Sequence, residues 1–324
     1  MRVLVTGLGF ISAYVIRLLV QDGHDVTVAT RNTYAAKHRA VADVLSQVRL
    51  LHGDLAEPWF AEQCAQVNAQ WVVHMAAETH VDRAISDPAC FVRANVLGTT
   101  LLLQALTHAP PESLLVYSTD EVFGPTPPGQ RFNEAAPLKP SNAYSASKVG
   151  VEAMAQAFIV THGLPITLVR PCNTYGPGQH PEKVIPKFVR QLLQGEPVTL
   201  YNDGLGARDW LHAEDHARAV LTLLEHGRAA TSYNLAAGDE HSDSEIATRI
   251  HAELVRAGTL PPGPAPFVYV PGRPGHDRRY WMDNRKLVAL GWKPEIPFDD
   301  GFRATVLWNA AHQDWWTHDL VGNF

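Results

Sequence analysis

Tyr144 and Lys148 form the first pair whose residue types and spacing could do chemistry. They are four positions apart, so in a helix both side chains lie on one face. A tyrosine hydroxyl ordinarily titrates near pH 10, which is too high for a base at neutral pH. A lysine ammonium one turn away and a nicotinamide cation both stabilise the phenolate and lower its pKa. Although this spacing also occurs by chance, it predicts a tyrosine that removes a proton from a substrate hydroxyl.

A second polar group, Thr119-Asp120-Glu121, directly follows the apolar run Leu114–Ser118. Ligands of parallel sheets bind beyond the carboxyl ends of the strands, which is where this group is expected to lie. Two adjacent carboxylates in a cleft can have different pKa values and divide the work of acid and base. The alternative is a solvated pair of loop carboxylates.

The segment Thr6–Ser12 reads TGLGFIS and lies between a strand-like and a helix-like run. In this position Gly7 and Gly9 let the backbone approach a pyrophosphate, and Phe10 and Ile11 open the helix whose N-terminus binds it. A purely structural turn is the alternative, but the placement at the end of the first strand favours dinucleotide binding.

The next strand ends at Thr30, followed by Arg31, where an NAD site usually has an acid for the ribose 2′-hydroxyl. An arginine there can instead accept the 2′-phosphate of NADP, or it is simply a solvated loop residue. At the end of the third strand stand Asp54 and Leu55, and the Asp54 carboxylate could reach the adenine amino group.

Strand-like and helix-like runs alternate through the first half of the chain and predict a doubly wound parallel (Rossmann) α/β sheet. We expect a nucleotide-cofactor-binding domain over residues 1–170 and a smaller, mixed α/β substrate-binding part over residues 171–324. The expected strands are Arg2–Thr6, Asp25–Ala29, Val48–Leu51, Trp71–Met75, Leu114–Ser118 and Ile166–Arg170, and the expected helices include Ile11–Asp22, Asn95–Thr107 and Ser147–Thr161.

The composition is that of a soluble globular protein, with 46% hydrophobic and 19% charged residues among 324. A net charge of -6 without a basic block argues against a nucleic-acid partner. Three scattered cysteines give neither a disulfide framework nor zinc spacing, and the pair His212 and His216 has no third ligand in sequence. We therefore expect no metal, no membrane span and a cytoplasmic location.

Eight segments together resemble the nucleoside-diphosphate-hexose 4,6-dehydratases of the extended short-chain dehydrogenase family, and most of all the branch that acts on dTDP-glucose. The resemblance runs almost end to end and implies a hydro-lyase with NAD and a nucleoside-diphosphate hexose. The segments are Ala76–Ile85, Ser118–Gly124, Tyr144–Lys148, Asn173–Pro177, Pro181–Pro186, Arg208–His216, Arg273–Tyr280 and Leu290–Pro294.

The resemblance also implies a role for each catalytic residue. Tyr144 takes the proton of the 4-hydroxyl while a hydride leaves C4, and Thr119 hydrogen-bonds the 4-oxygen. Glu121 then removes the C5 proton and Asp120 protonates the departing 6-hydroxyl, after which hydride returns to C6. Lys148 holds the cofactor ribose. The implied binding residues are Ala76 and Ala77 for the cofactor and Glu78, His80, Asn173, Glu182, Lys183, Arg208 and His276 for the substrate.

The chain departs from the family pattern at the cofactor. The glycine loop is one residue shorter, Ser12 replaces a glycine, and Thr30 replaces the ribose acid. We expect NAD, with NADP as the alternative. The segment Tyr201–Gly204 also differs from the usual YGxG, which leaves the nucleotide base open.

Three alternatives share parts of this pattern. A sugar 4-epimerase does not need the Asp120–Glu121 pair, and a UDP-glucuronate decarboxylase usually has serine in place of Asp120. A non-catalytic nucleotide-binding protein is the third. The resemblance further predicts a homodimer through apolar helix faces in Asn95–Leu106 and Ser147–Phe158, unless both faces pack on the sheet.

Overall fold

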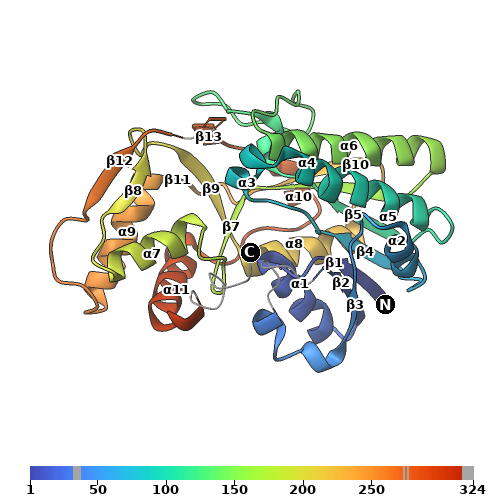
Figure 1. The fold of residues 1–324 in the computed structure, drawn as a ribbon, viewed down its shortest axis with the longest axis horizontal. Coiled ribbons are helices and arrows are strands. Elements are labelled where there is room, and N and C mark those ends of the chain that lie inside the picture. The colour runs from blue at the N-terminus through green and yellow to red at the C-terminus, as the bar shows by residue number, and fades with distance from the viewer. Residues whose placement is uncertain (32–37, 273, 276, 316–324) are drawn as a thin grey trace.

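The computed structural model describes residues 1–31, 38–272, 274–275 and 277–315. A seven-stranded parallel sheet forms the centre of its larger part, in the order β10-β6-β5-β4-β1-β2-β3 (Figure 1). The chain winds outwards in both directions from β1, which confirms the doubly wound fold. The strands are β1 (Arg2–Thr6), β2 (Asp25–Thr30), β3 (Val48–His52), β4 (Trp71–His74), β5 (Ser113–Tyr117), β6 (Ile166–Pro171) and β10 (Thr231–Leu235).

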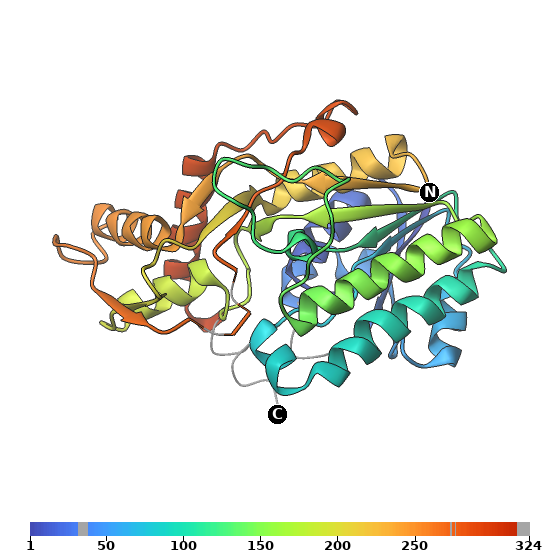
Figure 2. The same cartoon turned by 90° about the horizontal axis from the view of Figure 1, so that it is seen from above.

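Helices cover both faces of this sheet. α1 (Phe10–Gln21) and α8 (Ala213–His226) pack against each other on one face. On the other face lie α2 (Pro58–Ala65), α5 (Gly98–Leu106) and α6 (Ala143–His162). Figure 2 shows α5 and α6 side by side, with α8 on the opposite side of the sheet. Because most of the sheet is buried on both faces, the inner strands are almost continuously apolar.

The large sheet includes a strand from beyond residue 170. β10 pairs in parallel with β6, and α8 joins the helix layer next to α1. The segment reads TSYNL, whose polar residues hide its strand character in the sequence. The division into domains at residue 170 stays a prediction, and the cofactor-side sheet draws on both sides of it.

The expected helix Asn95–Thr107 is in fact two pieces. A π-helical turn, Val92–Leu97, follows the short α4 (Pro88–Phe91) and leads into α5. A π-turn inserts an extra residue and is frequent at functional sites. Here it carries Asn95, whose side chain is buried and bonded outside its own helix.

Within the described part of the chain, one helical run is long and apolar enough to cross a membrane, Pro88–Leu106. It contributes Leu102, Leu103 and Leu106 to the core between the sheet and its helices. Core helices of soluble proteins pass the same test of length and hydropathy, so this run is weak support for a membrane span.

The smaller part has its own core, in which α7, α9 and α11 pack together. β9 pairs with β7, β11 and β13, and β8 pairs with β12. Figure 1 shows this part beside the carboxyl ends of the large sheet. Its helices are α7 (Val184–Leu193), α9 (Asp243–Arg256) and α11 (Phe298–Ala311), and its strands are β7 (Asn173–Tyr175), β8 (Val198–Tyr201), β9 (Ala207–His212), β11 (Glu240–Ser242), β12 (Phe267–Val270) and β13 (Arg279–Tyr280). The short α-helices are α3 (Val81–Ser86) and α10 (Arg285–Val288), and the described residues also form three 3-10 helices, η1 (His38–Val41), η2 (Leu45–Gln47) and η4 (Asp120–Phe123).

Candidate active site

A cleft of about 360 Å³ opens at the carboxyl ends of the central strands. It brings together all five expected catalytic residues and all of the expected cofactor residues. Of the expected substrate residues, Glu78, His80, Asn173 and Lys183 line the cleft, whereas Glu182 and Arg208 do not. His276 lies outside the described residues. The lining includes Gly7, Gly9, Phe10, Ile11, Thr30, Arg31, Asp54, Leu55, Ala76, Ala77, Thr119, Asp120, Glu121, Tyr144 and Lys148.

Asp120 is a buried carboxyl directly after β5. The hydroxyl of Thr119 donates to Asp120 Oδ1 at 3.0 Å, while Oδ2 has no hydrogen-bond partner among the described residues. Burial raises the pKa of Asp120 to about 7, and the charge of Glu121 adds to this. The Thr119 hydrogen bond and the charge of Arg208 oppose the rise. Asp120 therefore holds a proton near neutral pH, as a general acid must.

Glu121, its neighbour, is only partly buried and faces the start of α6. Its Oε2 accepts a hydrogen bond from Asn142 Nδ2 at 3.1 Å. Asn142 is also the N-cap of α6, since its Oδ1 accepts the Ser145 N–H at 2.9 Å. Asn142 thus ties Glu121 to the helix that carries Tyr144. Asn142 was not predicted as a site residue, although an asparagine just before a helix is a recognisable N-cap signal in the sequence.

Tyr144 and Lys148 lie on the first turns of α6 and are both buried. Burial raises the pKa of Tyr144 above its ordinary value; the Glu121 carboxylate adds to the rise, and a hydrogen bond with Thr119 opposes it. In the chain without cofactor, burial therefore favours the neutral phenol, and the lowering expected from Lys148 together with a nicotinamide cation stays a prediction. Burial also lowers the pKa of Lys148 to about 8, against the charge of Glu152.

Asn95, in the π-helical turn, joins the segment after β4 to α6. Its Oδ1 accepts the Glu78 N–H at 2.8 Å, and its Nδ2 donates to the Glu78 carbonyl at 3.0 Å and to Ser147 Oγ at 2.9 Å. These bonds hold the wall of the cleft against the helix that carries the tyrosine. No local sequence pattern predicts a π-turn, so this role of Asn95 could not be found without the structure.

The glycine loop fits a dinucleotide pyrophosphate. Gly7 has φ +87, and a Cβ there would lie 3.0 Å from the Ala76 backbone, so only glycine suits this turn. Gly9 precedes α1 and leaves open space where a phosphate can approach the helix N-terminus. Ser12 is buried, and its Oγ accepts the Gly9 N–H at 2.7 Å. The serine that replaces the family glycine is therefore bonded within the loop.

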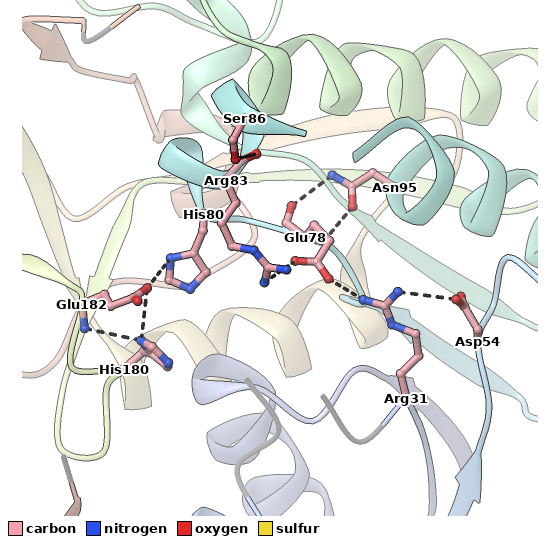
Figure 3. A network of polar contacts seen from close by, with 9 residues as sticks. All are labelled: Arg31, Asp54, Glu78, His80, Arg83, Ser86, Asn95, His180 and Glu182. Atoms are coloured by element: carbon pink, nitrogen blue, oxygen red, sulfur yellow. Dashed lines mark hydrogen bonds and ion pairs between the residues drawn. The ribbon is translucent and has the colours of Figure 1, made fainter. Parts of the chain in front are cut away.

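Arg31 contacts two carboxylates rather than lying free in solvent, as Figure 3 shows. One of its nitrogens donates to Glu78 Oε1, and another lies 3.4 Å from Asp54 Oδ2. Glu78 is buried and also faces Arg83 at 3.7 Å. Arg31 is thus an exposed loop residue, as one of the alternatives had it, but it is also ion-paired to carboxylates from two other strand ends.

Arg208 lies beside the cleft on β9. Its guanidinium donates to the carbonyls of Ala207 and Asp277, both at 2.8 Å, and stacks over the Tyr280 ring at 4.5 Å. Its charge still reaches Asp120, where it opposes the rise in pKa. Tyr280 in turn donates to Asp277 Oδ2 at 2.8 Å. An arginine held this way is a fixed positive charge at the substrate end of the cleft.

His212 and His216 do not face a common metal position. His216 is buried between the Tyr117 hydroxyl at 3.0 Å and Thr174 Oγ1 at 2.8 Å, and burial lowers its pKa to about 3. His212 Nδ1 accepts the Glu214 N–H at 3.3 Å. One group with metal-ligand atoms within 4.8 Å of one another does occur among the described residues, namely His80, His180 and Glu182. In it Glu182 lies 2.9 Å from His80 Nδ1 (Figure 3).

Comparisons with known proteins give a family and relatives whose names fit a dinucleotide site of this kind. The NAD dependent epimerase/dehydratase family matches residues 3–236. The dTDP-glucose 4,6-dehydratase of Streptomyces griseus is 39% identical, over 97% of this chain and 96% of the relative. DesIV, the dTDP-glucose 4,6-dehydratase of Streptomyces venezuelae solved with NAD, is 36% identical with a TM-score of 0.90, covering 98% of this chain and 99% of that one.

The Thermus thermophilus UDP-glucose 4-epimerase in complex with NAD is 30% identical with a TM-score of 0.88, covering 96% of this chain and 100% of the epimerase. Fold and overall likeness therefore extend beyond dehydratases, and the choice of reaction rests on the site. The chain belongs to the NAD dependent epimerase/dehydratase family.

Proposed function

We propose that this protein is a nucleoside-diphosphate-hexose 4,6-dehydratase that acts on dTDP-glucose with NAD. The observation that carries the proposal is the pair Asp120 and Glu121. Asp120 is a buried acid with a pKa of about 7, and Glu121 is a more exposed carboxylate next to it. Removing water across C5 and C6 needs one base and one acid on neighbouring atoms, which such a pair supplies.

Each residue has a part in that reaction. NAD bound at the glycine loop supplies reversible hydride transfer, so the sugar is oxidised at C4 and reduced again at C6. Tyr144 takes the proton of the 4-hydroxyl, and Thr119 donates a hydrogen bond to the 4-oxygen. The resulting ketone acidifies the C5 proton, which Glu121 removes. Asp120 gives its proton to the departing 6-hydroxyl as water leaves. When C6 is reduced, Glu121 returns its proton to C5, so no net oxidation results.

The alternative activities use less of this site. A 4-epimerase shares the C4 oxidation but has no step for a buried acid such as Asp120. A decarboxylase likewise transfers no proton to a 6-hydroxyl. A non-catalytic nucleotide-binding protein would not need to keep a carboxyl protonated near pH 7, which costs stability once that carboxyl ionises.

The test is to incubate the purified protein with dTDP-glucose and NAD and to follow the mass and oxidation state of the sugar. We expect loss of one water and appearance of a 4-keto sugar, and no reaction with Tyr144→Phe. A product of unchanged mass that is the C4 epimer would show an epimerase instead. If neither product forms, a panel of other nucleoside-diphosphate hexoses separates a wrong substrate from a wrong reaction.

A homodimer and a cytoplasmic location are also part of the proposal. The inner faces of α5 and α6 pack on the sheet through residues such as Leu103 and Ala155. Val92 and Leu97, on the π-helical turn that leads into α5, and Val160 on α6 are exposed, and these apolar side chains support pairing of the same helical region between two copies. Light scattering at micromolar concentration tests the homodimer, and a monomeric mass would contradict it.

A further inference from the structure

Residue 30, at the end of β2, is threonine instead of an acid, yet two carboxylates stand close by. Asp54 follows β3 and Glu78 follows β4, on either side of the neighbouring strands β1 and β2. Both line the same cleft as Gly7 and Gly9, and both meet at Arg31 (Figure 3). In this fold the 2′-position of the cofactor ribose lies near the end of the second strand.

The two carboxylates are held in place. Asn95 fixes the Glu78 backbone through both its N–H and its carbonyl, and the Glu78 side chain is only 8% exposed. Asp54 Oδ1 accepts the Ala56 N–H at 2.9 Å. The Glu78 backbone and the Asp54 carboxylate are therefore fixed by these bonds, and burial and the contact with Arg31 restrict the Glu78 carboxylate.

The charge of Arg31 is already balanced in this arrangement. The Arg31 guanidinium lies between the two carboxylates, so a phosphate dianion has to compete with both of them for it. Arg83 adds a second positive charge 3.7 Å from Glu78, but its side chain is half exposed and solvent screens this charge. The same dianion also approaches two fixed negative charges, which disfavours it. A ribose diol meets no such penalty, because its hydroxyls can donate to a carboxylate and accept from the guanidinium.

We propose that Asp54 and Glu78, gathered around Arg31, replace the missing acid after β2 and select a dinucleotide with a free ribose 2′-hydroxyl over one with a 2′-phosphate. This inference rests on the proposed use of a nicotinamide dinucleotide. It also argues against the alternative in which Arg31 accepts a 2′-phosphate, because the carboxylates that repel this phosphate come from other strands.

The experiment is calorimetric titration of the cofactor-free full chain with NAD and with NADP. The variants are Glu78→Gln and Asp54→Asn, each nearly isosteric and each removing one negative charge. We expect the wild type to bind NAD at least about 30-fold more tightly, and each variant to bind NADP about tenfold more tightly while NAD changes less than about threefold. Glu62 is an exposed residue of α2, and Glu62→Gln removes the same charge away from the cluster, so it should leave the difference between NAD and NADP affinity unchanged.

Salt gives a second readout. Salt screens the repulsion between the 2′-phosphate and the carboxylates. The wild-type preference for NAD over NADP should therefore shrink by ~3-fold or more between 0.05 and 1 M salt. In Glu78→Gln this salt dependence should be weaker. Thermal unfolding without cofactor checks that each variant folds. If Glu78→Gln does not fold, the more exposed Asp54→Asn still decides the question.

The outcomes separate the two proposals. The proposed selection by Asp54 and Glu78 is overturned if the wild type binds NADP as tightly as NAD. It is also overturned if the folded variants keep the wild-type difference between NAD and NADP affinity. Neither result contradicts the proposed function as an enzyme that uses a nicotinamide dinucleotide. If the wild type binds neither dinucleotide, the proposed function fails and this inference fails with it.

Discussion

The two ends of the cleft are specified in different ways. At the catalytic end, Thr119, Asp120 and Glu121 are consecutive, and Tyr144 and Lys148 share one helical face, so short motifs place most of the chemistry. At the cofactor end, Arg31 meets Glu78 from a different strand end, and no motif contains both. Local spacing therefore predicts the first region well, whereas only the folded chain shows the second.

Glu121→Gln should give the largest effect and tests the catalytic end. The amide cannot take the C5 proton, so we expect dehydration to slow by ~10²–10⁴. C4 oxidation should persist and appear as absorbance of the reduced cofactor in a single turnover. Dehydration at the wild-type rate would contradict the assignment of Glu121 as base.

Asp120→Asn also tests the catalytic end, because its stability reports whether the Asp120 carboxyl is protonated in the folded state. The folded pKa of Asp120 is raised from 3.8 to about 7, so the folded state holds this proton more tightly than the unfolded chain. For this group, stability is greatest below pH 3.8 and falls as pH rises to about 7. Three pKa units correspond to ~4 kcal/mol as an upper bound. We expect the inactive asparagine variant to unfold at higher temperature than the wild type at pH 8.

The pH series supplies its own control. At pH 4 the wild-type carboxyl is protonated in the folded state, so the two proteins should differ much less in unfolding temperature. The same difference at both pH values would mean that the substitution acts through packing. In the wild type, kcat/KM for dehydration should also decrease as pH rises through about 7, because the acid loses its proton.

The fold was predictable where periodicity is strong. Val3, Leu4 and Val5 are buried on both faces of the sheet, and such apolar runs read as strands without further information. β10 was not predicted, because Thr231 and Ser232 are polar and only pairing with β6 makes the segment a strand. Parallel neighbours are joined by long crossovers, so their pairing has no local signature.

The same distinction between local patterns and long-range contacts applies to the site. Tyr144 was predictable because its helix-compatible spacing to Lys148 is visible in the sequence. Asn95 and the ion pairs of Arg31 were not, because they depend on residues that are distant in sequence. The rise in the pKa of Tyr144 in the chain without cofactor was not predicted, because the burial that causes it depends on the whole fold.

Asn142→Ser tests whether the catalytic end also depends on a residue outside its motifs. Serine keeps the N-cap of α6, so stability should change little, but it loses the amide that donates to Glu121. We expect kcat to fall by roughly tenfold with KM nearly unchanged, as for a residue that orients a base. Asn142→Ala is the companion variant and should additionally lose about 1 kcal/mol of stability. An unchanged kcat in the serine variant would show that Glu121 needs no such support.

Ser12→Ala should give the smallest effect and addresses the cofactor end. Ser12 Oγ accepts the Gly9 N–H, which is one of the donors at the start of α1. Without cofactor, loss of this bond should destabilise the protein by about 0.5–1 kcal/mol, which thermal unfolding measures. With cofactor, the freed N–H can face the pyrophosphate, so calorimetry should show NAD binding about two- to fivefold tighter.

Ser12→Gly, which restores the family residue, gives the matched comparison. It frees the same N–H but adds the conformational cost of glycine inside a helix, roughly 0.5–1 kcal/mol, so it should be the less stable of the two variants with a similar gain in NAD affinity. If both variants instead bind NAD more weakly, the serine hydroxyl holds the short loop in its binding conformation. Because Ser12 and Gly9 belong to one motif, the cofactor end would then depend on local spacing as much as the catalytic end does.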